Sequence, residues 1–422
     1  MISALYTGVT GLAANSQELS VIGDNIANAN TIGFKGNRAA FEDALAQSMI
    51  GGLGGGGAGL GVQLQAVQRI LTQGALVSTG LATDLALQGS GFFLVSGSHA
   101  GRAGHFYTRA GQFTIDAGGY LVNLDGLRVQ GYSADGTGAL GNTLGDLRIG
   151  NASSAPLASS SVVIHANLQA DAAILPPWDV NDAANTSNFS TSVTVYDSLG
   201  RAHAVEIHYR RNGAGDWEWH AVTDGGGLQG GTAGTPTEIA SGTLTFDADG
   251  RLTASTQTSN FNPAGANGPQ PLSFDFGAPG STEGITQFAQ ASAVTFISQD
   301  GYAAGELTGV SIDQQGRIVG AFTNGQTRVL GQVAVADFQA PDQLERLGGN
   351  LFALTPAAGA PTIGAPGSGG RASIAAGALE QSNVDLATEL VRMITAQRGF
   401  QANSKTITTA DQLLSDLISL KR

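Results

Sequence analysis

Cysteine is absent from this chain of 422 residues, which excludes a disulfide framework and a zinc site built from thiolates. Charge is also scarce, because Asp, Glu, Lys and Arg make up only 13% of the residues, against about 25% in an average globular protein. The formal net charge of −13 argues against nucleic acid and anionic membrane surfaces as partners. No apolar run approaches the length of a membrane-spanning helix, so we expect no membrane insertion.

The N-terminus also lacks a basic region, since the first charged residue is Glu18 and the first cation is Lys35. A cleaved secretory signal requires such a region before its apolar core. We therefore expect that the protein, if it leaves the cell, is exported by another route. The absence of cysteine suits a chain that is exported unfolded and is then exposed outside the cell.

Glycine is abundant, with 62 residues, roughly twice the average share. Together with many Ser, Thr and Asn residues, this composition suits a β-rich fold with many turns. The low charge suits surfaces that pack against other copies, because interface cores are depleted of charged residues. The length exceeds that of one ordinary core and indicates two to four domains.

Each end of the chain carries an apolar stripe at helical spacing. One stripe predicts a helix from about residue 2 to 27, and the other predicts a helix from about 383 to 420 that begins at the sequence SNVDLATEL. We predict that these stripe residues form subunit interfaces: Ile2, Leu5, Val9, Leu12, Leu19, Ile26, Leu386, Leu390, Met393, Phe400, Ile407, Leu414 and Ile418.

A single stripe of this kind often packs on the globular domain of its own chain, and that alternative stays open for each helix. Two stripes at opposite chain ends favour burial against each other or against neighbouring copies, as a coiled coil. The polar residues Gln397, Ser404 and Asp411 interrupt the C-terminal seam. Because so polar a seam is weak in an isolated pair, we expect the helices to bundle among many subunits.

Between the two ends, the apolar period changes from 3.6 to 2. The segment SVTVYDSLGRAHAVEIHYR alternates apolar and polar residues on both sides of a turn. The turn sequence D-x-x-G recurs at residues 116–119, 197–200, 247–250 and 313–316. Asp opens such a turn by accepting backbone hydrogen bonds, and Gly accepts positive φ at its end. We therefore predict hairpins at all four positions and a mostly antiparallel middle region.

The resulting fold class is mainly β with long α-helical termini, in which discontinuous domains are nested. The N- and C-terminal helices are predicted to form a coiled-coil base, and antiparallel β domains lie outside it. Glycine-rich stretches at 51–61 and 364–370 predict flexible linkers. The predicted domains are a helical domain (1–30 and 380–422), a connecting region (31–71 and 359–379), a β domain (72–149 and 291–358) and an inserted outer β domain (150–290).

No motif in the chain indicates catalysis, so we expect no enzyme activity, no cofactor and no catalytic, cofactor-binding or metal-binding residue. His203 and His208 lie five apart on a predicted strand and point to opposite faces, so they cannot share a metal ion. The segment FDADGRL lacks the ligand spacing of an EF-hand loop, and Gly52, Gly54 and Gly57 match a dinucleotide motif without its strand and helix. The sequence leaves one catalytic arrangement open, a pair of carboxylates that only the fold brings together.

Three blocks of sequence resemble one family, the bacterial flagellar rod and hook axial proteins. The first is IGDNIANANTIGFKGNRAAFEDAL near the N-terminus. The second joins QRILTQGALVSTGLATDLALQGSGFFLV to FYTRAGQFTIDAGGYLVNLDGLRVQGY, and the third is ALEQSNVDLATELVRMITAQRGFQANSKTITTADQLLSDLISL. The blocks stand at the corresponding ends and in the same order as in that family.

Within this family, the chain resembles hook subunits more than rod subunits. Rod proteins are typically shorter, and here roughly 225 residues separate the first β region from the final helix. A distal rod protein remains the alternative, and a secreted adhesin or surface-layer protein is the rival from another class. Neither rival explains the inserted region and the two helical stripes together.

The resemblance implies a structural subunit that self-assembles into a curved hollow tube, a universal joint transmitting torque from motor rod to filament. It implies a homopolymer of many copies with rod, hook cap and hook–filament junction proteins as partners. It also implies an extracellular location on the flagellum, after export by the flagellar type III apparatus without a cleaved signal peptide. The terminal helices would line the inner tube and fold on assembly.

The motif ANANTIGFK is predicted to form the turn at which the chain leaves the N-terminal helix. Asn28 and Asn30 can bond nearby backbone and tolerate left-handed geometry, and Gly33 permits a sharp turn. We predict that this turn is also a subunit contact, in which Phe34 enters a groove of a neighbouring copy and Lys35 meets a carboxylate there. An ordinary helix cap explains part of the motif equally well. The residues of the turn are Asn28, Asn30, Thr31, Gly33, Phe34 and Lys35.

Overall fold

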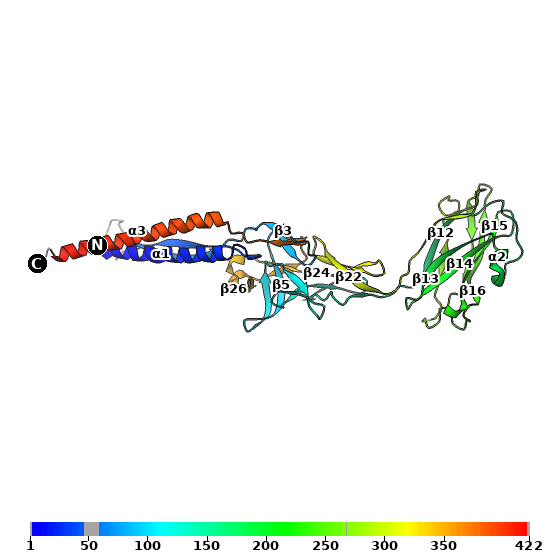
Figure 1. The fold of residues 1–422 in the computed structure, drawn as a ribbon, viewed down its shortest axis with the longest axis horizontal. Helices are drawn as coiled ribbons and strands as arrows, with labels where there is room; N and C mark the ends of the chain where they lie inside the picture. Colours follow the sequence, from blue (N-terminus) through cyan, green and yellow to red (C-terminus); the bar gives the residue numbers. More distant parts are fainter. Residues whose placement is uncertain (1, 46–58, 267, 420–422) are drawn as a thin grey trace. The chain divides into compact units, whose positions relative to one another are not determined.

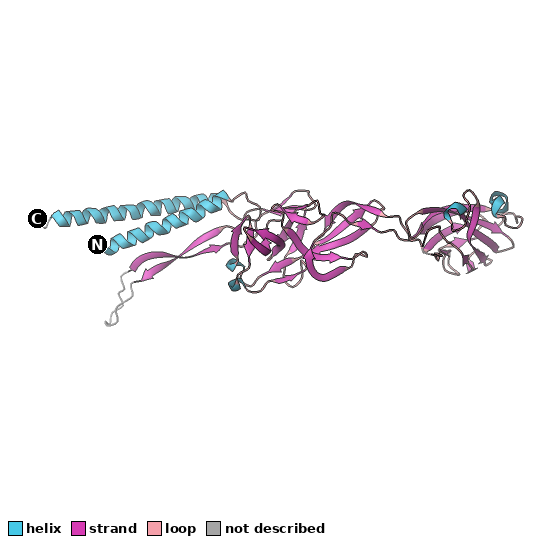
Figure 2. Cartoon of the chain, turned by 90° about the horizontal axis from the view of Figure 1, so that it is seen from below, coloured by secondary structure: helices cyan, strands magenta, loops and turns pink. Residues whose placement is uncertain are grey.

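The computed structural model describes residues 2–45, 59–266 and 268–419. The chain is mainly β with a long helix at each end, as predicted (Figures 1 and 2). It divides into two compact units. Unit 1 contains residues 1–152, 309–321 and 327–422, and unit 2 contains residues 153–308 and 322–326. The finer division into four regions stays a prediction.

The helices of unit 1 are α1 (Ile2–Ala27) and α3 (Leu386–Ser419), close to the predicted boundaries. Asp385 caps α3, because its carboxylate accepts hydrogen bonds from the Ala387 N–H (3.0 Å) and the Thr388 hydroxyl (2.7 Å). No helix among the described residues has both the length and the apolar character needed to cross a membrane.

The remaining elements of unit 1 are short strands and two 3₁₀ turns. They are β1 (Asn37–Leu45), β2 (Gly59–Arg69), β3 (Leu76–Ser78), β4 (Leu85–Gln88), β5 (Phe92–His99), β6 (Arg102–Thr108), β7 (Phe113–Ile115), β8 (Leu121–Asn123), β9 (Arg128–Ala134), β10 (Leu140–Asp146), β22 (Gly305–Ile312, shared with unit 2), β23 (Arg317–Phe322, which ends in unit 2), β24 (Thr327–Val333), β25 (Val335–Asp337), η3 (Pro341–Gln343), β26 (Glu345–Gly348), β27 (Leu351–Ala353), η4 (Pro356–Ala358), β28 (Thr362–Gly364), β29 (Ser373–Ala376) and β30 (Ala378–Glu380).

Strands that are distant in the sequence pair within unit 1. The main sheet has the order β22-β23-β24-β9-β5-β6-β27-β26. Two small sheets join the early and late parts of the chain, β3 with β30 and β4 with β29. The hairpin of β1 and β2 lies against α1, where the Val62 N–H reaches the Thr10 hydroxyl.

Unit 2 is built from β11 (Ser153–Ser154), β12 (Ser161–Asn167), η1 (Val180–Asp182), α2 (Ala183–Thr186), β13 (Phe189–Tyr196), β14 (Ala202–Arg211), β15 (Asp216–Asp224), η2 (Gly225–Gly227), β16 (Pro236–Phe246), β17 (Leu252–Ser255), β18 (Thr258–Ser259), β19 (Ser273–Asp275), β20 (Ile285–Thr286) and β21 (Ala293–Gln299). One sheet has the order β13-β14-β15-β16-β17, and the other is built on β12. Most pairings are antiparallel as predicted, but β12 pairs in parallel with β19 and β20.

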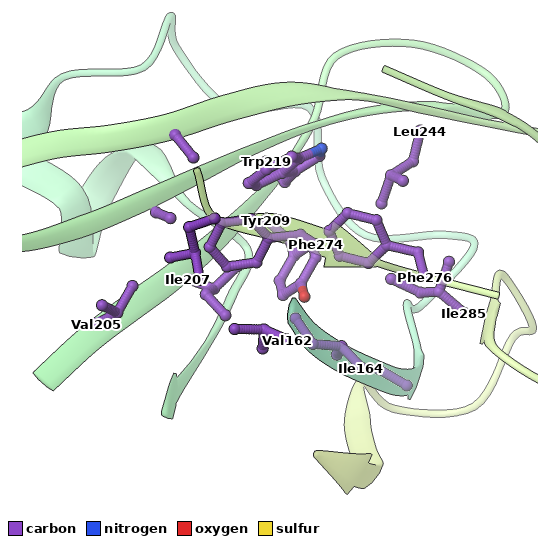
Figure 3. Close-up of a cluster of buried hydrophobic side chains, with 14 of the residues drawn as sticks. Val162, Ile164, Val205, Ile207, Tyr209, Trp219, Leu244, Phe274, Phe276 and Ile285 are labelled. Atoms are coloured by element: carbon purple, nitrogen blue, oxygen red, sulfur yellow. The ribbon is translucent and has the colours of Figure 1, made fainter. Parts of the chain in front are cut away.

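The core of unit 2 lies between its two sheets. Trp217, Trp219 and Tyr209 are its largest fully buried side chains. Figure 3 shows Val162 and Ile164 of β12 on the side of Tyr209 in this core. All three tryptophans of the chain lie in this unit, so tryptophan fluorescence reports the unfolding of unit 2 alone.

The four D-x-x-G turns are confirmed as hairpin turns. Each glycine has positive φ, between 73° and 82°, and donates its N–H to the carbonyl of the turn aspartate. The turns join β7 to β8, β13 to β14, β16 to β17 and β22 to β23. Of the stretch 51–61, residues 51–58 lie outside the described part of the chain and residues 59–61 begin β2 rather than a linker. In the other stretch, Gly364 ends β28 and residues 365–370 form turns before β29.

One turn aspartate is fully buried. Asp197 accepts hydrogen bonds from the N–H groups of Leu199 and Arg201, both at 2.9 Å, and lies 3.3 Å from His203 Nε2. Burial alone would raise the pKa of Asp197, but these partners hold it below its ordinary value of 3.8. The carboxylate therefore stabilises unit 2 fully above pH 3.8, and this stabilisation is lost as the pH falls through the lower folded-state pKa.

The variant Asp197→Asn is expected to cost unit 2 about 1–3 kcal/mol at pH 7, because a charged acceptor is replaced by a neutral amide. The difference from the unchanged protein should shrink below pH 3.8. Urea unfolding followed by tryptophan fluorescence at pH 7 and pH 3 measures both effects. The matched control is Asp249→Asn, an exposed position in another D-x-x-G turn; an equal loss in the control, or a pH-independent difference, would contradict the prediction.

Candidate functional site

The two terminal helices lie side by side in unit 1, with the sequence running in opposite directions (Figures 1 and 2). Three close approaches define this contact: Gly8 with Ile407, Gly11 with Asn403, and Gly399 with Asn15. A Cβ atom at Gly11 would lie only 2.5 Å from Asn403 Nδ2, so the glycine permits the close packing. The helices therefore contact each other within one chain, whereas a coiled coil among copies stays a prediction.

The predicted N-terminal stripe does not coincide with the buried face of α1. Gly8 and Gly11 face α3, and the Asn25 side chain bonds the backbone of Asn37 in β1. By contrast, Leu5, Leu12, Leu19 and Ile26 are only half-buried, and Val9 is 56% exposed. The side chain of Ile2 lies outside the described part. On α1 the close approaches to α3 are made by small and polar residues, while α3 contributes the apolar Ile407 to them. Much of the N-terminal stripe stays uncovered.

The C-terminal stripe divides in the same way. Met393, Ile407 and Leu414 are half-buried in the single chain, while Phe400 is exposed. The side chain of Ile418 is not described. Near its start, α3 carries an exposed apolar group that we call the α3 ridge: Leu386, Leu390, Val391 and Ile394. These side chains recur at helical spacing and are 45% to 64% exposed.

A cavity of about 370 Å³ lies beside the helix pair. It is lined by Ser16 and Leu19 of α1 and by Gln397, Phe400 and Gln401 of α3. This lining of two apolar and three polar side chains suits an amphipathic partner surface better than a small charged ligand.

The motif turn follows α1 directly and is held by local hydrogen bonds. Asn28 donates its side-chain amide to the Asp24 carbonyl (2.9 Å), and the Thr31 hydroxyl donates to Asn28 Oδ1 (3.2 Å). Gly33 has φ of +70°, and a Cβ there would lie 2.7 Å from the Ala110 N atom, so the turn requires glycine. Neither Asn28 nor Asn30 takes the left-handed conformation that their residue type would tolerate.

The prediction that Phe34 enters a groove of a neighbouring copy is wrong. Its ring is 2% exposed in the single chain, and the Arg346 guanidinium lies 5.0 Å from the ring centroid. The carboxylate that Lys35 meets also belongs to the same chain. Lys35 Nζ lies 2.6 Å from Glu380 Oε1 and donates to the Thr72 carbonyl at 2.8 Å.

Glu380 binds a second buried cation. Its Oε2 lies 3.3 Å from Arg109 Nη1, and its Oε1 also accepts the Gly74 N–H at 2.9 Å. Lys35 and Glu380 have fully buried side chains, and Arg109 is nearly so. Burial lowers the pKa of Lys35 and of Arg109, and the contact with Glu380 opposes this in both. We call these residues the Lys35–Glu380–Arg109 triad; sequence patterns gave no signal for it, because its members lie far apart in the chain.

Four family models match the chain. They are the flagella basal body rod protein (residues 5–35), the flagellar hook protein FlgE/F/G D1 domain (86–172), the flagellar basal body protein FlaE D2 domain (167–302) and the flagellar basal body rod FlgEFG protein C-terminal region (375–420).

Full-length relatives agree with the family models. The chain is 34% identical to the flagellar hook protein FlgE of Escherichia coli K12, over 99% of this chain and 100% of that one. It is 36% identical to the protein of the same name from Borreliella burgdorferi, over the full length of both chains, and 36% identical to that from Salmonella typhimurium, over 98% of each. The chain belongs to the family of flagellar hook proteins.

Proposed function

We propose that this chain polymerises into the flagellar hook as its structural subunit, and that the uncovered faces of α1 and α3 make the contacts between copies. One observation carries the proposal: the α3 ridge leaves four large apolar side chains exposed together near the start of α3. Contiguous exposed apolar surface of this kind is typical of protein interfaces. The full-length match to hook proteins does not favour the distal rod alternative.

The cavity beside the helix pair is a second feature that suits a contact between copies. Leu19 and Phe400 lie in it, and both belong to the predicted stripes. An apolar side chain from the α3 ridge of another copy has the chemistry to occupy it, beside the amides of Gln397 and Gln401. Each copy would then supply both a ridge and a cavity, which is the head-to-tail contact that open helical polymers need.

The finer features of the hook function stay part of this proposal. They comprise the curved hollow tube, the role as a universal joint, the contacts with rod, cap and junction proteins, and export through the type III apparatus to an extracellular location. Their support is the resemblance of the chain to the hook and rod family.

The variant Val391→Asp tests the proposed interface. Val391 is 64% exposed, so the stability of the single chain should change by less than about 0.5 kcal/mol. A charge buried in the contact between copies should raise the concentration required for polymerisation at least about tenfold. Sedimentation of polymer against subunit concentration measures this, with unfolding of the subunit measured in parallel.

The control is Leu199→Asp, which places the same charge at an exposed apolar residue of unit 2. It should polymerise at the same concentration as the unchanged chain. Normal polymerisation of Val391→Asp would exclude the α3 ridge as an interface while leaving the family assignment intact. Loss of polymer in both variants would assign the effect to charge in general.

A further inference from the structure

We propose that Glu380 is a completion latch: the early part of unit 1 does not fold into its closed, buried arrangement until β30, which carries Glu380, has paired with it. The early part consists here of residues 33–36, 70–88 and 109–110, and we call it the N-terminal joint. The inference rests on unit 1 itself and does not depend on how copies assemble.

The triad pairs two buried cations of the N-terminal joint with a single carboxylate from the end of the chain. Lys35 and Arg109 both belong to the N-terminal joint, and Glu380 is the carboxylate that pairs with both. It lies 345 residues after Lys35 and 271 residues after Arg109 in the sequence. Without it, closing the joint would bury two like charges with no ion-paired carboxylate, because Asp337 acts on Arg109 only from beyond ion-pair distance. An unpaired buried charge is strongly destabilising. The repulsion between the cations adds to this cost, because Arg109 itself lowers the pKa of Lys35.

Residues next to Glu380 also form hydrogen bonds with the backbone of the N-terminal joint. The Gly33 N–H donates to the Glu380 carbonyl (2.8 Å), and the Gln381 N–H donates to the Ala75 carbonyl (2.9 Å). Asn383 accepts from the Gly36 N–H (2.8 Å) and donates to the Ile70 carbonyl (2.8 Å). Strands β3 and β4 have β30 and β29 as partners. Residues 373–383 thus supply hydrogen-bond partners to the backbone of the joint, including the buried residues Gly33 and Gly36.

Unit 2 shows the opposite organisation. Its larger sheet joins β13, β14, β15, β16 and β17 in sequence order, each to the next. Such local pairings close short loops and form without waiting for distant residues. The larger sheet of unit 2 therefore needs only hairpins between neighbouring strands, whereas the N-terminal joint needs residues 373–383, which lie near the end of the chain.

Hydrogen exchange on the full chain gives the first test. In the variant Glu380→Gln, the Ile70 and Leu85 amides should exchange at least about a hundredfold faster, because the joint opens to separate the unpaired cations. These amides donate to the carbonyls of Gly36 and Gly111, so neither bond involves residue 380 itself. Amides of β14 and β15 should keep their protection. The matched control is Glu345→Gln, which removes the carboxylate of an exposed pair with Arg102 and should leave all of them unchanged.

A second variant separates charge from simple packing. Adding Lys35→Met to Glu380→Gln removes one of the two uncompensated cations, so protection of Ile70 and Leu85 should recover at least about tenfold. If Glu380 were only a hydrogen-bond acceptor, losing Lys35 as well would lower protection further. That outcome, or unchanged exchange in Glu380→Gln alone, would overturn the latch.

Pulse-labelled refolding of the unchanged chain tests the order of events. The Ile70 and Leu85 amides should become protected in the same kinetic phase as the Gln381 amide, and after the amides of β14 and β15. Protection of Ile70 before Gln381 would show that the joint closes without the C-terminal strand and would overturn the proposal. None of these results bears on polymerisation, so a failure here is distinguishable from a failure of the hook interface.

Discussion

The variant Phe34→Ala is expected to lower the free energy of unfolding of unit 1 by about 3–5 kcal/mol, because a fully buried aromatic ring leaves a cavity. The ring packs where the chain leaves α1, under the guanidinium of Arg346. Its neighbour Lys35 enters the Lys35–Glu380–Arg109 triad, so displacement of Phe34 also disturbs a buried ion network. Hydrogen exchange of the β5 and β6 amides measures the loss, because unit 1 contains no tryptophan.

The control for this experiment is Leu124→Ala, since Leu124 is 71% exposed in the same unit. Its effect on unit 1 should stay within about 0.5 kcal/mol. A Phe34→Ala chain that is as stable as the control but fails to polymerise would restore the idea of Phe34 as a contact between copies. The burial of the ring predicts the reverse order, with loss of the subunit fold first.

The variant Trp219→Ala is expected to destabilise unit 2 by about 3–5 kcal/mol. The indole is fully buried and packs against Phe274 and Phe276, with ring centroids at 4.9 and 5.1 Å. Its N–H donates to the Thr256 carbonyl at 3.2 Å, so the substitution also removes that hydrogen bond. Urea unfolding followed by the fluorescence of the remaining Trp178 and Trp217 measures the shift, and the amides of unit 1 should keep their protection.

Tyr209→Phe is the matched control in the same core. The Tyr209 hydroxyl is fully buried and has no hydrogen-bond partner among the described residues. Removing it relieves a desolvated polar group, so stability should stay equal or rise by up to about 1 kcal/mol. A loss of several kcal/mol in Tyr209→Phe would show that the hydroxyl is bonded and that this core tolerates no change.

Features that depend on neighbouring residues followed from the sequence. The D-x-x-G turns are an example, because Asp197 and Gly200 make their hydrogen bond and take their backbone angles within four residues. Both terminal helices were predicted within a few residues of their ends for the same reason, since apolar spacing and the Asp385 cap are local signals. The parallel pairing of β12 carries no such signal and was not predicted.

The motif turn illustrates the limit of local patterns. Its residue types predicted a turn after α1, and the Gly33 conformation agrees with that. The same residue types could not tell which chain supplies the partner of Phe34 and Lys35. Arg346 and Glu380 lie more than three hundred positions away, and only the folded chain brings them to the turn.

The helical stripes show the same division. Apolar periodicity establishes that α1 and α3 have an apolar face, because the spacing of side chains around a helix is a local property. Which face meets which neighbour depends on close approach, and here Gly8 and Gly11 place α3 beside the small residues of α1 rather than on its apolar stripe. Sequence alone is therefore enough for the helices, the turns and the mainly β class. Tertiary packing decides the seam between the helices, the buried triad and the apolar surface left for other copies, because each depends on residues that are distant along the chain.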